Sequence, residues 1–233
     1  NGDPVITVAI MAVCIVVWVI EAVLFLVWPS GGNALVNAGV LLPATAMHRP
    51  WTFITSMFLH QPTSLWHILF NMMTLWCVGP VLERMMGHWP YLALYMLSGL
   101  GGGAGLMVWA ACSPSGWVTS AYGASGALFG LFAAIVVVYR RIGIDIRSML
   151  IWMLINFLMP VIMPGIAWQA HVGGFIVGGV FAWLLVSGLR ALRGRSLPCR
   201  TTVYGIVLLV AIVAIDVCCN MANPYAALAA LIQ

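Results

Sequence analysis

Charged residues are scarce in this chain of 233 residues, and lysine is absent. Only 6% of the residues are charged, 64% are hydrophobic, and the mean hydropathy is +1.09. Soluble domains carry roughly 25% charged residues, so this composition predicts an integral membrane protein. The net charge of +4 does not indicate nucleic-acid binding, because the arginines lie in short loops between apolar runs.

Cysteine motifs are also missing. The chain has no CxxC pair and no cysteine–histidine cluster, so we expect neither a metal nor another cofactor, and we interpret the cysteines as small apolar packing residues. They are Cys14, Cys77, Cys112, Cys199, Cys218 and Cys219. The chain also has no initiator methionine and no basic stretch at its start. We therefore expect it to be trimmed, and it carries no information about a further soluble domain.

Apolar runs separated by loops dominate the sequence. A helix that crosses the hydrocarbon core needs about 20 apolar residues. The expected helices cover residues 5–28, 65–82, 89–111, 123–139, 149–163, 168–189 and 203–219. We therefore predict an all-α fold, a polytopic membrane helix bundle that forms a single membrane domain over residues 1–233.

Two of the expected segments are irregular. Pro160 and Pro164 break the fifth run. Residues 29–64 contain four prolines and are half apolar, which makes them too long for a plain connector. We expect this long segment to have structure of its own and to lie in the membrane interface.

The arginines indicate the orientation of the bundle. Eight of the nine fall in loops that lie on one side of a chain with seven helices, and only Arg49 falls opposite. The eight are Arg84, Arg140, Arg141, Arg147, Arg190, Arg193, Arg195 and Arg200. The positive-inside rule then predicts a cytoplasmic N-terminus and a C-terminus outside.

Ser125 opens the fourth apolar run, within the sequence Gly-Ala-Ser-Gly. Most membrane serines cap a helix or pack closely, and this remains one interpretation. The flanking Gly123 and Gly126 favour another, because backbone can approach the hydroxyl without a Cβ in the way. Free N–H groups at a helix N-terminus would stabilise an oxyanion there.

His171 is the best candidate for a base that activates this serine. His171, Gly174 and Gly178 share one face of the sixth run. Gly126 and Gly130 supply a similar row of small residues on the fourth run, so close contact of the two helices would bring the imidazole to the serine hydroxyl. The alternative is a histidine satisfied by a neighbouring carbonyl group.

His67 and Asn71 lie one turn apart on the second run. An amide N–H aimed at a developing oxyanion is one use of such a pair, and a hydrogen bond between helices is the alternative. A pair of haem ligands, His67 with His171, is disfavoured because the sequence shows no second tier of ligands. At 1.5 Å per residue, Asn71, Ser125 and His171 lie about 18, 22 and 28 Å from the charged residues that close their helices. All three therefore fall in the outer half of the membrane.

These elements together resemble the rhomboid family of intramembrane serine proteases over about residues 51–187. The family's G-x-S-G element matches residues 123–126, and its A-H-x-x-G-x-x-x-G element matches residues 170–178. Its H-x-x-x-N element matches residues 67–71, and its E-x-x-x-G element matches residues 83–87. The last apolar run looks like the extra helix of the six-plus-one arrangement found in part of the family. The resemblance thus implies a rhomboid-like six-helix core at about residues 5–190 and a seventh helix at about residues 203–219.

The resemblance implies a role for each matching residue. Ser125 would be the nucleophile and His171 the general base, in a dyad without a carboxylate. Asn71, His67 and the backbone N–H of Ser125 would line the oxyanion hole. The substrates would be transmembrane segments of other proteins, with the fifth helix and the loop near Pro164 gating their entry from the lipid.

Some features depart from the family pattern or lie outside it. Several members have a tyrosine where this chain has Phe129, which can stack on the histidine but cannot donate a hydrogen bond. Arg49-Pro50-Trp51 only loosely matches the Trp-Arg pair in the first loop of many members. Glu21 and Asp216 could each supply a third catalytic residue, although partial solvation or a hydrogen bond between helices is the simpler interpretation.

The sequence leads to one principal function and two competitors. We expect a serine protease that cuts in or near transmembrane segments, in a bacterial inner membrane, with lipid as its surroundings and without nucleic-acid partners. A catalytically silent, rhomboid-like scaffold that binds transmembrane segments is the alternative. A transporter would show inverted repeats, and none is evident. The physiological substrate, the cleavage-site preference and the oligomeric state stay open.

Overall fold

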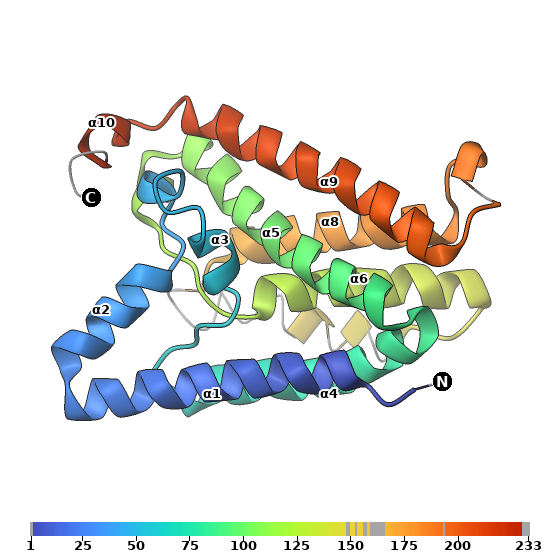
Figure 1. Ribbon diagram of the computed structural model, residues 1–233, viewed down its shortest axis with the longest axis horizontal. Helices are drawn as coiled ribbons and strands as arrows, with labels where there is room; N and C mark the ends of the chain where they lie inside the picture. The colour runs from blue at the N-terminus through green and yellow to red at the C-terminus, as the bar shows by residue number, and fades with distance from the viewer. Residues whose placement is uncertain are drawn as a thin grey trace.

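The computed structural model describes residues 2–147, 150–151, 153–155, 158, 166–192 and 194–229. In this part of the chain, six helices are long and apolar enough to cross a membrane (Figure 1). They are α1 (Val5–Val27), α4 (Leu65–Met86), α5 (His88–Cys112), α6 (Ser125–Ile142), α8 (Trp168–Val186) and α9 (Leu197–Asn220). The prediction of an all-α, multi-pass membrane protein is confirmed.

The expected fifth crossing at residues 149–163 lies largely outside the described residues, as do Pro160 and Pro164. A separate seventh helix is therefore not part of the described structure, and the six-plus-one arrangement stays a prediction. The expected C-terminal helix is present as α9.

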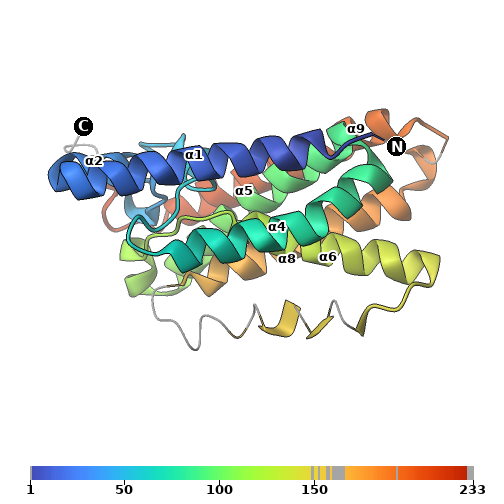
Figure 2. The same cartoon turned by 90° about the horizontal axis from the view of Figure 1, so that it is seen from below.

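α5 occupies the centre of the bundle. It is the most buried of the six helices, whereas α1 and α9 are the least buried and present most of their apolar side chains outward. α1 and α4 lie side by side on one flank and α9 covers α5 on the other, as the two perpendicular views show (Figures 1 and 2). The start of α1 and the end of α9 lie at opposite ends of the bundle (Figure 1).

Glycines bring α6 and α8 into backbone contact. A Cβ on Gly174 would overlap the carbonyl oxygen of Gly126, and one turn further along a Cβ on Gly178 would overlap the Cα of Gly130. Both members of the second pair lie four residues after those of the first, so the two helices run parallel. In an apolar solvent, close packing of this kind drives helix association where hydrophobic burial cannot.

Several arginines lie at the same side of the bundle, as the sequence predicted. α4, α6 and α8 all begin near the same cavity and therefore end at the opposite side of the bundle. Arg84 lies in the last turn of α4, and Arg140 and Arg141 lie in the last turn of α6. Arg200 donates to the carbonyl groups of the last turn of α8.

Two predicted helix boundaries differ most from the observed ones. α4 continues through Glu83 and Arg84 to Met86, although these charged residues were expected to close it. Glu83 is tolerated there because its carboxylate accepts hydrogen bonds from the backbone N–H groups of Ile6 and Thr7 at 2.8 Å, which otherwise lack partners at the start of α1. The carboxylate thereby caps the N-terminus of a neighbouring helix.

The start of α9 was also misplaced. The helix begins at Leu197, six residues before the expected position, and includes Arg200. The guanidinium group of Arg200 does not need a loop, because it binds the carbonyl groups of Leu184 and Leu185 at the end of α8. The charge is satisfied by the negative end of a helix.

The segment between α1 and α4 has structure of its own, as expected. It contains α2 (Pro29–Gly39), a 3₁₀ turn η1 (Pro43–Thr45) and α3 (Thr52–Thr55). The indole of Trp51 donates to the carbonyl of Ala38, and the hydroxyl of Thr55 donates to that of Gly39. These bonds satisfy the last carbonyl groups of α2 and fold the segment over one end of the bundle.

The glycine contact predicts opposite outcomes for two neighbouring substitutions. Gly178→Ala forces a Cβ into the backbone of α6, so we expect a loss of about 1–3 kcal/mol of stability and a lower Tm. Gly179→Ala is the matched control, because its Cβ would meet only the Cβ of Ala133 at 3.3 Å. Thermal unfolding in detergent micelles measures both. An equal Tm for the two variants would contradict the assigned contact.

Candidate active site

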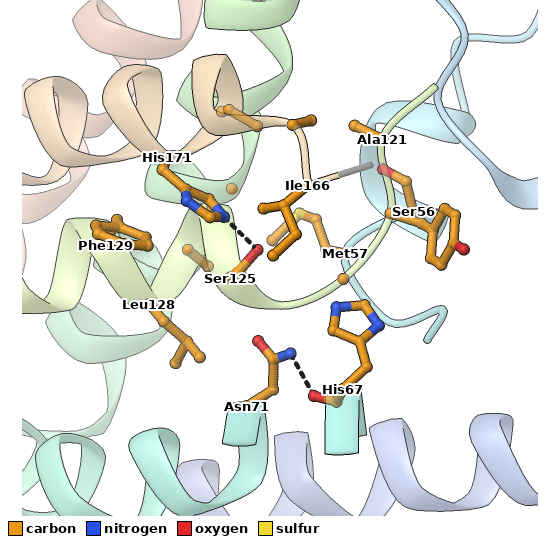
Figure 3. Close-up of a pocket in the computed structure, with 18 of the residues that line it drawn as sticks. Ser56, Met57, His67, Asn71, Ala121, Ser125, Leu128, Phe129, Ile166 and His171 are labelled. Atoms are coloured by element: carbon orange, nitrogen blue, oxygen red, sulfur yellow. Dashed lines mark hydrogen bonds between the residues drawn. The ribbon is translucent and has the colours of Figure 1, made fainter. Parts of the chain in front are cut away.

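Ser125 and His171 meet at the α6–α8 contact. The imidazole Nε2 of His171 lies 2.9 Å from the hydroxyl Oγ of Ser125, which is hydrogen-bonding distance (Figure 3). Ser125 is the first residue of α6, and Gly123 two residues before it has a φ of 123°, a conformation that residues with a Cβ rarely adopt. The sharp turn at this glycine delivers the serine to the start of the helix.

The imidazole of His171 is held mainly by packing. The ring of Phe129, one turn after Ser125 on α6, stacks on it with the centroids 4.2 Å apart and the planes 19° from parallel. The other ring nitrogen, Nδ1, is buried and has no hydrogen-bond partner in the described part of the chain. Among the described residues, neither Glu21 nor Asp216 binds it.

His67 lies on the other side of Ser125 from His171 (Figure 3). The backbone N–H of Gln61 donates to its Nδ1 at 3.1 Å. Since Nδ1 accepts this bond, a neutral His67 carries its proton on Nε2. That nitrogen would lie only 3.0 Å from a Cβ on Gly123, so it points to the turn that precedes Ser125.

Asn71 lies one turn beyond His67 and beside it in the site. Its side-chain Nδ2 donates to the carbonyl of His67 at 2.7 Å. An amide nitrogen has two hydrogens, so a second N–H remains for another acceptor. The two bonds at His67, one to its ring from Gln61 and one to its carbonyl group from Asn71, leave the Nε2 of His67 and one N–H of Asn71 available.

A cavity of about 310 Å³ opens around these residues. Its walls come from α4, α5, α6 and the start of α8, and from the loops that precede α4, α6 and α8. The polar side chains among its lining residues are Ser56, Gln61, Ser64, His67, Asn71, Thr74, Ser120, Tyr122, Ser125 and His171. It therefore combines an apolar floor with polar groups that can bind water or a peptide.

Two ionisable groups in the loops beside the cavity stay neutral. Burial, with a smaller effect from a charge on His67, lowers the pKa of His60 to about 3. Burial also raises the pKa of Tyr122, and the nearby Glu21 raises it further. The rings of both residues pack near that of His67, with centroids 5.2 and 6.0 Å away. The loops thus enclose His67 without adding charge of their own.

The structure brings together the four residues that the sequence singled out. It also shows neighbours that the sequence analysis missed, above all Gln61, which acts through its backbone, and Tyr122, which packs against His67. Tyr122 lies directly before the Gly-Ala-Ser-Gly element, and this position was the one sequence feature that could have indicated that it lies near the site. Among the described residues, no group of three or more His, Cys, Asp or Glu could hold a metal ion.

Comparison with known proteins identifies the family. The sequence profile of the Rhomboid domain matches residues 47–188, which is more than half of the chain. The chain belongs to the rhomboid family. Rhomboid proteases act within membranes on transmembrane substrates, and the described helices fit a member of that family.

Three relatives illustrate the similarity of this rhomboid chain to known proteins. YdcA of Bacillus subtilis (strain 168) is 36% identical over 141 residues, which cover 58% of this chain and 67% of YdcA. Rhomboid protease GluP of the same strain is 30% identical over 198 residues, 78% of this chain and 35% of GluP. Rhomboid protease AarA of Providencia stuartii is 28% identical over 161 residues, 58% of this chain and 57% of AarA. The chain thus matches only about a third of the length of GluP.

The stacking of Phe129 on His171 predicts a specific defect. Phe129→Leu removes the ring that orients the imidazole, and aromatic pairs contribute about 0.5–1.5 kcal/mol. We expect Ser125 to react about 2- to 10-fold more slowly with a fluorophosphonate. Phe132→Leu is the matched control, since this buried ring contacts Phe129 edge-on. Equal labelling rates for the two variants would show that the stacking does not orient the base.

Proposed function

We propose that this rhomboid protein is a serine endopeptidase that hydrolyses peptide bonds in or near transmembrane segments of other membrane proteins. The observation that carries the proposal is the 2.9 Å approach of His171 Nε2 to Ser125 Oγ inside a cavity at the N-terminal end of α6. A hydroxyl alone is a weak nucleophile, and a neighbouring base activates it. No metal or cofactor takes part in this chemistry.

The reaction proceeds in two halves. His171 Nε2 accepts the hydroxyl proton while Ser125 Oγ bonds to the scissile carbonyl carbon, which gives a tetrahedral oxyanion. The C–N bond then breaks, and His171 gives its proton to the leaving amine. A water molecule enters the cavity, His171 removes one of its protons, and the hydroxide attacks the acyl-enzyme ester. Collapse of this second intermediate returns the proton to Ser125 Oγ and releases the new carboxyl end.

Three donors would stabilise the oxyanion. The backbone N–H of Ser125 lies at the start of α6, where N–H groups have no partner within the helix. The Nε2–H of His67 faces the turn before Ser125, and Asn71 Nδ2 retains a second N–H. Donors that already point to the position of the developing charge need no reorganisation during the reaction.

The substrate is another protein's transmembrane segment, and it reaches the site from the surrounding lipid. The family relationship supports this choice, together with a mostly apolar cavity that lies between membrane helices. The described residues do not include most of the segment around Pro164 that we expect to gate entry. A catalytically silent scaffold would bind similar segments, but nothing in the site favours it, because both members of the dyad are present.

The proposal includes a seventh crossing and an orientation. α6 and α8 run parallel, so the chain has to return between Ile142 and Trp168, and the apolar run at residues 149–163 fits that return. With the arginine-rich ends of α4, α6 and α8 in the cytoplasm, the N-terminus is cytoplasmic and the C-terminus lies outside. The chain is then one membrane domain, a six-helix core with α9 as the additional helix, in a bacterial inner membrane.

Substitution of the dyad tests the proposal directly. We expect Ser125→Ala and His171→Ala each to abolish cleavage of a model transmembrane substrate in detergent, because one removes the nucleophile and the other its base. Gly179→Ala serves as a control that keeps both groups. Equal product from the original chain and both dyad variants would overturn the protease assignment and favour the scaffold.

Asn71→Ala tests the oxyanion hole. Loss of one donor costs about 10²–10³ in kcat, and we expect a decrease of this size with little change in KM, since the donor acts mainly in the transition state. Met73→Ala, on the exposed side of the same helix, should leave kcat unchanged. A change in KM alone would place Asn71 in substrate binding instead.

A further inference from the structure

α1 supplies no residue to the lining of the catalytic cavity, yet it binds the loop beside it. The carboxylate Oε2 of Glu21 accepts a hydrogen bond from the backbone N–H of His60 at 3.0 Å. One turn earlier on α1, the indole Nε1–H of Trp18 donates to the carbonyl of Gln61 at 3.1 Å. α1 therefore binds the backbone N–H of His60 and the carbonyl group of Gln61, which are successive residues of the loop.

The same loop backbone sets the protonation of His67. The Gln61 N–H points at Nδ1 of His67, and two donors cannot face each other across 3.1 Å. While this N–H stays in place, the neutral ring keeps its proton on Nε2, next to the turn that carries Ser125. If the loop shifted, Nδ1 could hold the proton and Nε2 would become an acceptor, which repels an oxyanion.

Glu21 has no simpler use in the described structure. It is completely buried. An acidic side chain within a membrane helix is energetically costly and usually marks a functional site. It is not the third member of a triad, because its bond goes to the loop and not to His171. Its carboxylate is the one side-chain acceptor that holds the His60 N–H.

We propose that Glu21 is a positioning residue for peptide-bond hydrolysis: through the His60–Gln61 backbone it fixes the tautomer of His67, so that Nε2–H faces the oxyanion. This inference rests on the proposed function for its effect on catalysis. Its effect on the His67 ring is independent of activity and can be measured separately.

A double-mutant cycle tests the catalytic part. We expect Glu21→Leu to lower kcat about tenfold or more, up to the roughly 10²–10³-fold decrease for complete loss of one oxyanion donor. Glu21→Gln should restore most of kcat because the amide oxygen can accept the His60 N–H. In a His67→Ala background, Glu21→Leu should cause no further decrease, because the group on which it acts is gone. An equal fold-decrease in both backgrounds would overturn the proposal and indicate a general structural role.

Asp216→Leu is the matched control for burial. Asp216 is the other buried acid of a peripheral membrane helix, and it does not line the cavity. We expect any effect of this substitution on kcat to be the same with and without His67. If Glu21→Leu does not fold, Trp18→Phe removes the second tie to the loop and takes its place in the cycle, with the same expected dependence on His67.

Histidine-selective ¹⁵N NMR in detergent tests the structural part without turnover. With His67→Ala used to assign its signals, we expect His67 to show a protonated Nε2 and a bare Nδ1 in the original chain. Both tautomers should appear in Glu21→Leu or Trp18→Phe. An unchanged His67 tautomer in the variants would overturn the proposal even in an active enzyme. A chain that cleaves no more than Ser125→Ala but shows the expected tautomer change would instead contradict the proposed function alone.

Discussion

The backbone contact between α6 and α8 determines the geometry of everything in the site. Gly126 and Gly130 on one helix face Gly174 and Gly178 on the other, so closely that a Cβ on Gly174 or Gly178 would overlap main-chain atoms of α6. This contact sets the distance between the two helix starts, and Ser125 and His171 stand at those starts. The 2.9 Å distance between His171 Nε2 and Ser125 Oγ thus depends on the glycines, which let the two helix backbones approach closely.

Buried carboxylates connect α1 to the remainder of the bundle. Glu83 on α4 caps the first turn of α1, and Glu21 on α1 binds the loop before α4. In both cases the acceptor is a side chain and the donors are backbone N–H groups that would otherwise be unsatisfied, so each bond offsets two desolvation costs at once. α1 is mostly exposed to lipid and could not be placed accurately by apolar packing alone. Directional bonds near each of its ends fix both its register and, in our proposal, the loop that orients His67.

The sequence predicted the parts of this protein that depend on spacing along a helix. The small-residue rows Gly126–Gly130 and Gly174–Gly178 and the pair His67–Asn71 lie at helical intervals, so their faces could be assigned before their partners were known. It could not predict the extension of α4 past Glu83 or the inclusion of Arg200 in α9, because a charge near an apolar run ordinarily marks its end. Both charges bind backbone groups of another helix. The bond from Gln61 to His67 was hidden for the same reason, since any residue except proline supplies a backbone N–H.

The two histidines of the site illustrate different ways to orient an imidazole. His67 is fixed by a hydrogen bond at Nδ1, which leaves Nε2 as a donor. His171 has no such bond among the described residues, and its ring is held by Phe129 on one face and by Ser125 at Nε2. In a triad the carboxylate selects the tautomer of the base and stabilises the cation that forms. In the proposed reaction, the serine hydroxyl favours the tautomer of His171 with a bare Nε2, and the cation that forms is stabilised by the nearby oxyanion. The oxyanion donors then carry more of the catalysis than in a triad, which makes the orientation of His67 a requirement of the proposed chemistry.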